Sequence, residues 1–212
     1  MNKAQLTALT VMQQGPVIPV LVIDKVSHAV PLAKALLAGG IKVLEVTLRT
    51  DCALDAIAKI AEQVPEAIIG AGTVISNQQF KEAKSAGAQF VISPGLTDSL
   101  LDHAASSNTP FIPGISTVSE LMKGMDRGLT EFKFFPAEAN GGVPALKALA
   151  AVFPKVHFCP TGGITINNAS HYLTLPNVVC VGGSWLATPQ LLNAENFDEI
   201  TRFAQQSSSL RV

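Results

Sequence analysis

The sequence predicts an α/β protein that folds as a (β/α)₈ TIM barrel with one extra helix at its N-terminus. A short apolar strand, a loop with Gly, Pro or Thr, and an amphipathic helix recur about every 23 residues. Eight evenly spaced units of this kind fit a closed barrel, whereas an open doubly wound sheet seldom needs eight. The strands are short and apolar, as parallel strands covered by helices should be.

The elements follow one another without a linker or a shift in composition, so residues 1–212 are expected to form a single domain. The predicted strands span residues 17–23, 43–47, 67–71, 90–93, 111–113, 131–134, 157–160 and 178–181. The predicted helices lie near residues 3–13, 27–38, 53–63, 77–86, 98–106, 117–127, 143–153, 167–173 and 197–206.

Composition narrows the class of protein. A net charge of −1 and 15% charged residues, with no basic cluster, argue against binding to nucleic acid. No apolar run approaches the roughly 18 residues of a membrane span, and the first residues do not read as a signal peptide. The three cysteines have no C-x-x-C spacing that would predict disulfides or zinc. We therefore expect a cytoplasmic protein that binds neither membranes nor nucleic acid.

Lys133 stands alone in an aromatic strand that contains Phe132, Phe134 and Phe135. Because strand side chains alternate, Lys133 and Phe135 face one way and the other two aromatic rings face the opposite way. Burial disfavours the ammonium form, so a buried lysine can act as a nucleophile towards a carbonyl group. The same run also fits an edge strand in which lysine prevents pairing with another sheet.

Glu45, Thr47 and Arg49 share one face at the end of the second predicted strand. A carboxylate inside a barrel is costly unless it is paired or protonated, so Glu45 is a candidate general acid and base. The alternative is a structural ion pair between Glu45 and Arg49. Active sites of TIM barrels lie where strands end, which is where these residues fall.

Small residues follow several other strands. Gly70, Gly72 and Thr73 at the end of the third strand would let a ligand approach the backbone, although the third glycine of a dinucleotide-binding motif is missing. Pro94 follows the fourth strand, and Gly114, after the fifth, is interpreted as part of an ordinary turn.

Two glycine pairs follow the last two strands, at residues 160–163 and 182–184. A phosphate group often binds between these two loops in TIM barrels, held by backbone N–H groups. Ser184 could add a hydroxyl group. A single glycine pair is usually a tight turn, but two pairs at the two expected loops favour a phosphate site.

The four histidines do not gather at strand ends, and the aspartates lack metal-ligand spacing, so no metal and no cofactor are predicted. Tyr172 and Trp185 are interpreted as packing groups. The remaining lysine, glutamate, arginine and hydroxyl groups suit carbonyl chemistry through an imine on a phosphorylated substrate.

Six motifs closely resemble the family of 2-keto-3-deoxy-6-phosphogluconate (KDPG) aldolases, which also act as 4-hydroxy-2-oxoglutarate (KHG) aldolases. They are EVTLRT at 45–50, GAGT at 70–73, ISPG at 92–95, IPGIS at 112–116, KFFPAE at 133–138 and PTGG at 160–163. The resemblance runs in order from about residue 15 to residue 187. It implies a metal-free class I aldolase of the Entner–Doudoroff pathway, usually a homotrimer, that acts on a phosphorylated keto acid.

The resemblance also implies a role for matching positions. Lys133 would form the Schiff base and Glu45 would act as acid and base. The expected substrate contacts are Arg49 and Thr73 at the pyruvate carboxylate, Pro94 and Phe135 in the pocket wall, Thr161 near the hydroxyl-bearing carbons, and Gly162, Gly163 and Ser184 at the phosphate. Some relatives carry an arginine late in the first strand, where this chain has residues 19–22, PVLV. A contact to phosphate or carboxylate from that strand is therefore not expected.

Two other classes of protein fit parts of this pattern. A phosphosugar isomerase or a non-imine lyase on the same barrel would keep both glycine loops but would form no covalent carbonyl adduct. A binding-only barrel would use Lys133 as a counter-ion, although an anion site has no need of a buried Glu45. Reductive trapping with pyruvate would separate these classes from an imine-forming enzyme.

Overall fold

The computed structural model describes residues 6–210, and all of its paired strands run parallel. The strands are β1 Val17–Leu21, β2 Val43–Thr47, β3 Ile68–Gly72, β4 Phe90–Ile92, β5 Phe111–Ile112, β6 Gly114–Ile115, β7 Glu131–Phe134, β8 His157–Pro160 and β9 Val181–Gly183. Six of them form a curved sheet in the order β5-β4-β3-β2-β1-β9, and three form a second sheet in the order β6-β7-β8. The predicted α/β class with parallel strands is confirmed.

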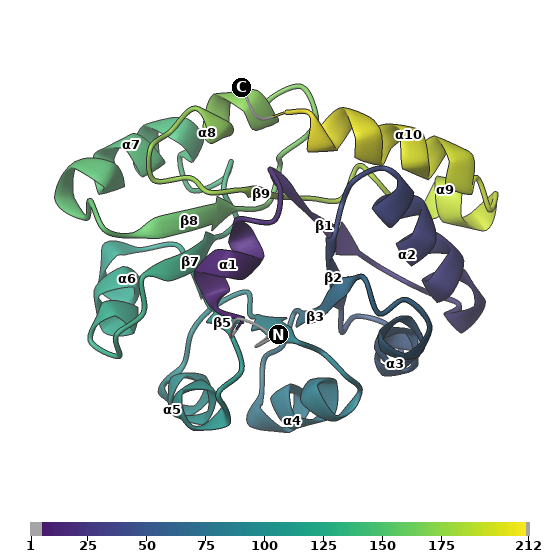
Figure 1. Ribbon diagram of the computed structural model, residues 1–212. Coiled ribbons are helices and arrows are strands. Elements are labelled where there is room, and N and C mark those ends of the chain that lie inside the picture. The colour runs from purple at the N-terminus through teal and green to yellow at the C-terminus, as the bar shows by residue number, and fades with distance from the viewer. Residues whose placement is uncertain (1–5, 211–212) are drawn as a thin grey trace, which may run out of the picture.

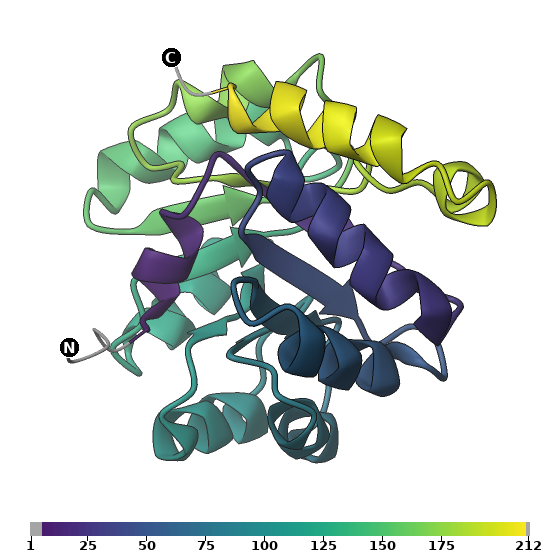
Figure 2. The same ribbon diagram turned by 45° about the vertical axis from the view of Figure 1, so that its right-hand side comes forward.

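Helices surround the strands on the outside, and α1 lies across one end of them (Figures 1 and 2). The α-helices are α1 Ala8–Met12, α2 Ala29–Ala38, α3 Ala53–Gln63, α4 Asn77–Ser85, α5 Asp98–Ser107, α6 Val118–Met125, α7 Gly142–Val152, α8 Ala169–Leu173, α9 Pro189–Asn193 and α10 Phe197–Ser208. A short 3₁₀ helix, η1, spans Val26–His28. The predicted first helix includes residues 3–5, which lie outside the described residues.

Local sequence explains where several helices begin. Ser76, Thr97 and Thr117 precede α4, α5 and α6, and each side chain accepts a hydrogen bond from a backbone N–H of the first turn. These bonds satisfy donors that a helix leaves free at its N-terminus. Thr188 caps α9 in the same way. Helix α9 was not predicted, whereas η1 lies at the start of the helix predicted at 27–38.

Two apolar clusters follow the alternation of the strands. The larger one lies between strands and helices and includes Leu44, Phe132 and Phe134. The smaller one includes Val11 and Met12 of α1, together with side chains that point away from the outer helices. Those side chains are Ile18, Val43, Phe90, Ile92, Ile112 and Cys159. The strands are thus covered on both faces, which explains their continuous apolar character.

Two strand predictions were wrong in detail. The run at 111–113 is divided at Pro113, which has no N–H to donate to a neighbouring strand. The last strand was predicted at 178–181, but β9 begins at Val181 and includes Gly182 and Gly183. These glycines pair with Ile18 and Pro19 of β1, so they belong to the sheet and not to the loop that follows it.

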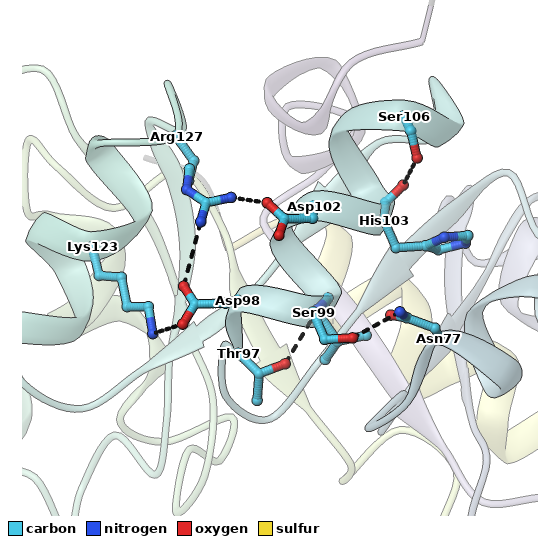
Figure 3. A network of polar contacts seen from close by, with 10 residues as sticks. Asn77, Thr97, Asp98, Ser99, Asp102, His103, Ser106, Lys123 and Arg127 are labelled. Carbon is cyan, nitrogen blue, oxygen red and sulfur yellow. Dashed lines mark hydrogen bonds and ion pairs between the residues drawn. The ribbon is translucent and has the colours of Figure 1, made fainter.

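Ion pairs join α5 to α6 on the surface (Figure 3). Asp98 contacts Lys123 at 2.9 Å and Arg127 at 3.5 Å, and Arg127 also pairs with Asp102. On the other side of α5, the Asn77 amide of α4 donates to Ser99 at 2.8 Å. Polar contacts thus connect three successive outer helices.

Within residues 6–210, no helix combines the length and the apolar character needed to span a bilayer.

Candidate active site

Lys133 of β7 and Glu45 of β2 meet among the inward-facing side chains. Lys133 Nζ donates to Glu45 Oε1 at 3.3 Å, and the two residues are 6% and 1% exposed. As predicted, both side chains point inward, whereas Phe132 and Phe134 pack in the outer apolar cluster. The alternative of an edge-strand lysine was wrong, because β7 lies between β6 and β8.

Glu45 has room for its carboxylate because residue 72 is a glycine. A Cβ atom at Gly72 would overlap the Glu45 side chain, with 2.6 Å to Cγ and 2.7 Å to Cδ. Gly72 pairs with Thr47, two residues further along β2. From sequence, Gly72 was interpreted only as space for a ligand. Its contact with Glu45 depends on the pairing of β2 with β3.

Arg49 does not pair with Glu45. Its Nε donates to Thr47 Oγ1 at 3.1 Å, and the Thr47 hydroxyl donates to Leu21 O at 2.8 Å. Among residues 6–210 the ion-pair partner of Glu45 is Lys133, so the alternative of a Glu45–Arg49 pair was wrong. The Arg49 side chain is exposed, which leaves its guanidinium accessible to a ligand.

The Phe135 ring lies beside the lysine, with Lys133 Nζ 5.3 Å from its centroid. This distance allows a cation–π attraction between the ammonium and the ring face. Phe135 follows β7 on the same parity as Lys133, which is the arrangement that strand alternation predicts.

A cavity of about 200 Å³ brings together residues from five strands or strand ends, those of β1, β2, β7, β8 and β9. It is lined by Val20, Arg49, Phe135, Thr161, Gly162, Gly163, Ile164, Gly182 and Ser184. Six of these side chains or glycines were predicted as substrate contacts from sequence. Val20 lies within residues 19–22, the end of the first strand where some relatives carry an arginine. Here it presents an apolar surface to the cavity.

The loop after β8 contains two consecutive glycines in a left-handed backbone conformation. Gly162 and Gly163 have φ values of +103° and +76°, which favour glycine. A Cβ at Gly182 of β9 would lie 2.9 Å from Thr161 Cγ2, so this glycine lets the two strand ends come close together. The exposed Ser184 follows β9 directly. This part of the cavity presents backbone groups and hydroxyls, and Arg49 is the one cation among the residues that line the cavity as a whole.

Thr73 and Pro94 follow β3 and β4 and do not line this cavity. Thr73 has φ +59°, an uncommon left-handed backbone for threonine. A Cβ at Gly114 would overlap the Pro94 carbonyl group. Gly114 lies in strand β6, and its lack of a side chain allows the close approach of Pro94. Its interpretation as part of a turn was wrong.

The arrangement suits chemistry on a carbonyl compound. A buried amine beside a carboxylate can form and protonate an imine, and the neighbouring arginine can bind an acid group. No group of three His, Cys, Asp or Glu side chains is placed to hold a metal ion within residues 6–210. The contact between Lys133 and Glu45 gives the site the features of an enzyme that uses lysine as a nucleophile.

Comparison with known proteins gives the family. The family model for KDPG and KHG aldolase matches residues 9–203. The KHG/KDPG aldolase of Escherichia coli K12 is 59% identical over 207 residues, which are 98% of this chain and 97% of that protein. The chain belongs to the KDPG and KHG aldolase family, as the motifs indicated.

Solved structures agree with this result. A KDPG aldolase from Legionella pneumophila, with pyruvate captured as a covalent carbinolamine intermediate, has 50% identity and a TM-score of 0.95. The match covers 97% of this chain and all of that one. The aldolase of Zymomonas mobilis ZM4 with 3-phosphoglycerate has 47% identity and a TM-score of 0.91, with 98% of each chain covered.

Proposed function

We propose that this protein is a class I aldolase that cleaves KDPG to pyruvate and glyceraldehyde 3-phosphate, and KHG to pyruvate and glyoxylate. The observation that carries the proposal is the buried contact of 3.3 Å between Lys133 and Glu45. The names of the relatives support both substrates, and the carbinolamine in the Legionella protein supports covalent chemistry with pyruvate.

The reaction begins when the neutral amine of Lys133 attacks C2 of the keto acid. Loss of water from the carbinolamine leaves an iminium, which withdraws electrons from the C3–C4 bond. Removal of the C4 hydroxyl proton breaks that bond and releases the aldehyde. The electron pair stays on an enamine, which is protonated at C3, and hydrolysis then releases pyruvate and regenerates the amine.

Glu45 is the group that carries these protons. Its carboxylate contacts Lys133 Nζ directly, so it can take a proton from the attacking amine and return it to the departing water. Acting through a water molecule, the same carboxylate would take the C4 hydroxyl proton. Its burial keeps solvent from competing for these transfers.

The two ends of the substrate would bind to two different sets of residues. Arg49 and Thr73 hold the pyruvate carboxylate, and Pro94 and Phe135 enclose the carbon chain. An arginine fork can donate two hydrogen bonds to a carboxylate and so fixes the keto acid before attack. Thr161 contacts the hydroxyl-bearing carbons, while the phosphate binds Gly162, Gly163 and Ser184, whose backbone and hydroxyl donors line the cavity.

We further propose that the strands close into a complete (β/α)₈ barrel in one domain, with α1 as an extra helix across the N-terminal end. Pro113 alone separates β5 from β6, and its carbonyl accepts from Lys133 N at 2.9 Å. On the other side, single bridges link Phe158 to Val178 and Thr161 to Gly182. Counting β5 and β6 as one strand gives a ring of eight.

A cytoplasmic homotrimer completes the proposal. The exposed apolar stripe on α6 supports self-association, because Val118 and Met122 lie one turn apart and are 47% and 54% exposed. The occupant would be a second copy of this chain.

Reductive trapping tests the proposed chemistry. The protein is incubated with pyruvate and borohydride, and peptide mass spectrometry locates any covalent adduct. We expect modification of Lys133 and no adduct in Lys133→Ala, with Lys147→Ala, a change at an exposed lysine of α7, as the control. Absence of an adduct from the unmodified protein, with phosphate esters still bound, would instead favour an isomerase or a non-imine lyase.

A further inference from the structure

Tyr172 is a fully buried phenol whose hydroxyl has a specific partner. It lies on α8, is 1% exposed, and its hydroxyl donates to Glu138 Oε1. Burial, and then the neighbouring Glu138 carboxylate, raise the pKa of Tyr172, which favours the protonated phenol that donates this hydrogen bond. Glu138 is otherwise exposed, and it lies on the segment between β7 and α7.

The segment between β7 and α7 is hydrogen-bonded to the glycine loop after β8, which is residues 161–163. Ala137 N donates to Thr161 O at 2.8 Å, and Glu138 N donates to Gly162 O at 3.1 Å. The Glu138 side chain also lies against the loop, because a Cβ at Gly163 would be 2.6 Å from Glu138 Cγ. Glu138 therefore contacts the loop through both its backbone and its side chain.

Helix α8 holds the other end of that loop. The Asn168 amide, at the start of α8, donates to Gly163 O at 3.2 Å, and its oxygen accepts from Thr165 N at 2.8 Å. The bond from Tyr172 to Glu138 then connects α8 back to the segment after β7. The glycine loop is thus held between two elements that this single side-chain bond joins.

We infer that Tyr172 and Glu138 are positioning residues for the phosphate end of the site, an inference that rests on the proposed function. Together they fix the position of the Gly162 and Gly163 N–H groups relative to Lys133. The connection to Lys133 runs along the chain, because β7 carries Lys133 and leads into the segment that contains Glu138. Loss of the bond should affect binding of the phosphorylated end more than chemistry at the lysine, because the bond lies on the loop side of the cavity.

Tyr172→Phe tests this inference, because it removes the hydroxyl and keeps the ring. For cleavage of KDPG we expect KM to rise about five- to tenfold, the effect of one lost hydrogen bond, with kcat within about twofold. Exchange of the pyruvate methyl protons in deuterium oxide, followed by NMR, needs only the lysine end and should keep its rate.

Three further variants complete the test, two of them as controls. Glu138→Gln keeps an oxygen that can accept from Tyr172, so KM should stay near that of the unmodified protein, whereas Glu138→Ala should match Tyr172→Phe. Thr174→Ala removes another hydroxyl at the end of α8, which donates to His171 O at 3.0 Å, and should leave KM unchanged.

An unchanged KM in Tyr172→Phe, or an equal loss of pyruvate exchange, would overturn the inference. If the unmodified protein neither exchanges pyruvate protons nor cleaves KDPG, the proposed function has failed instead.

Discussion

The absence of a side chain at Gly72 matters, because it decides where the Glu45 carboxylate can lie. In Gly72→Ala the new Cβ would overlap that carboxylate and displace it from Lys133. Misplacement of a catalytic group by about 1 Å can cost about 10²-fold, so we expect a loss in kcat of that order. Steady-state cleavage of KDPG measures it.

The fold should survive this change, because the displaced carboxylate is a single side chain near strand ends. Circular dichroism and thermal unfolding check that expectation. Ala71→Gly, on the opposite face of β3, is the matched control, and it should keep kcat while lowering stability. A Gly72→Ala enzyme with full kcat would show that the Glu45 carboxylate can move without consequence.

Glu45→Gln separates the proton-transfer role of Glu45 from its space-filling role. The amide has nearly the same shape but cannot carry a proton between steps. We expect kcat to fall about 10²- to 10⁴-fold, with binding of KDPG partly retained. Single-turnover kinetics with isothermal titration would measure the two effects separately, and an unchanged kcat would remove Glu45 from the mechanism.

At the scale of elements, the ion pairs between α5 and α6 predict a dependence of stability on pH. Hydrogen bonding to Lys123, opposed by desolvation and helped by the charges of Lys123 and Arg127, holds the pKa of Asp98 below its usual range. A carboxyl group with a lowered pKa in the folded state stabilises it above the unfolded pKa. That contribution is lost as the pH falls through the folded pKa.

Asp98→Asn is the variant that tests this dependence (Figure 3). The difference in Tm between the two proteins should be small at pH 6, because these groups are exposed, and should shrink towards pH 3. Added salt should reduce the difference at pH 6 as well. A difference that grows as the pH falls would show that Asp98 does not act through its charge.

For the molecule as a whole, the predicted assembly is three copies of the 22.2 kDa chain. Sedimentation equilibrium measures that mass directly, and a monomer at micromolar concentration would contradict the prediction. Met122→Lys should weaken the assembly, because it places a charge within the exposed stripe of α6. A trimer that is unaffected by this change would assign the contact to another face.

Most of the architecture could be predicted from sequence because it depends on local periodicity. The inward orientation of Glu45 and Lys133 follows from the alternation of β2 and β7, and both strands were placed correctly. The boundary of β9 was not, because Gly182 and Gly183 resemble a turn until their pairing with β1 is known. The helix α9 was also missed.

Sequence alone determined the parallel α/β class, the family and the residue types at the strand ends, since motifs and side-chain alternation are properties of neighbouring residues. Only the tertiary structure decided that Glu45 pairs with Lys133 and not with Arg49, that Gly72 and Gly114 give room to Glu45 and Pro94, and that Tyr172 meets Glu138. Each of these contacts joins residues that are distant in the chain, and their distances depend on how the strands and helices pack around a common centre.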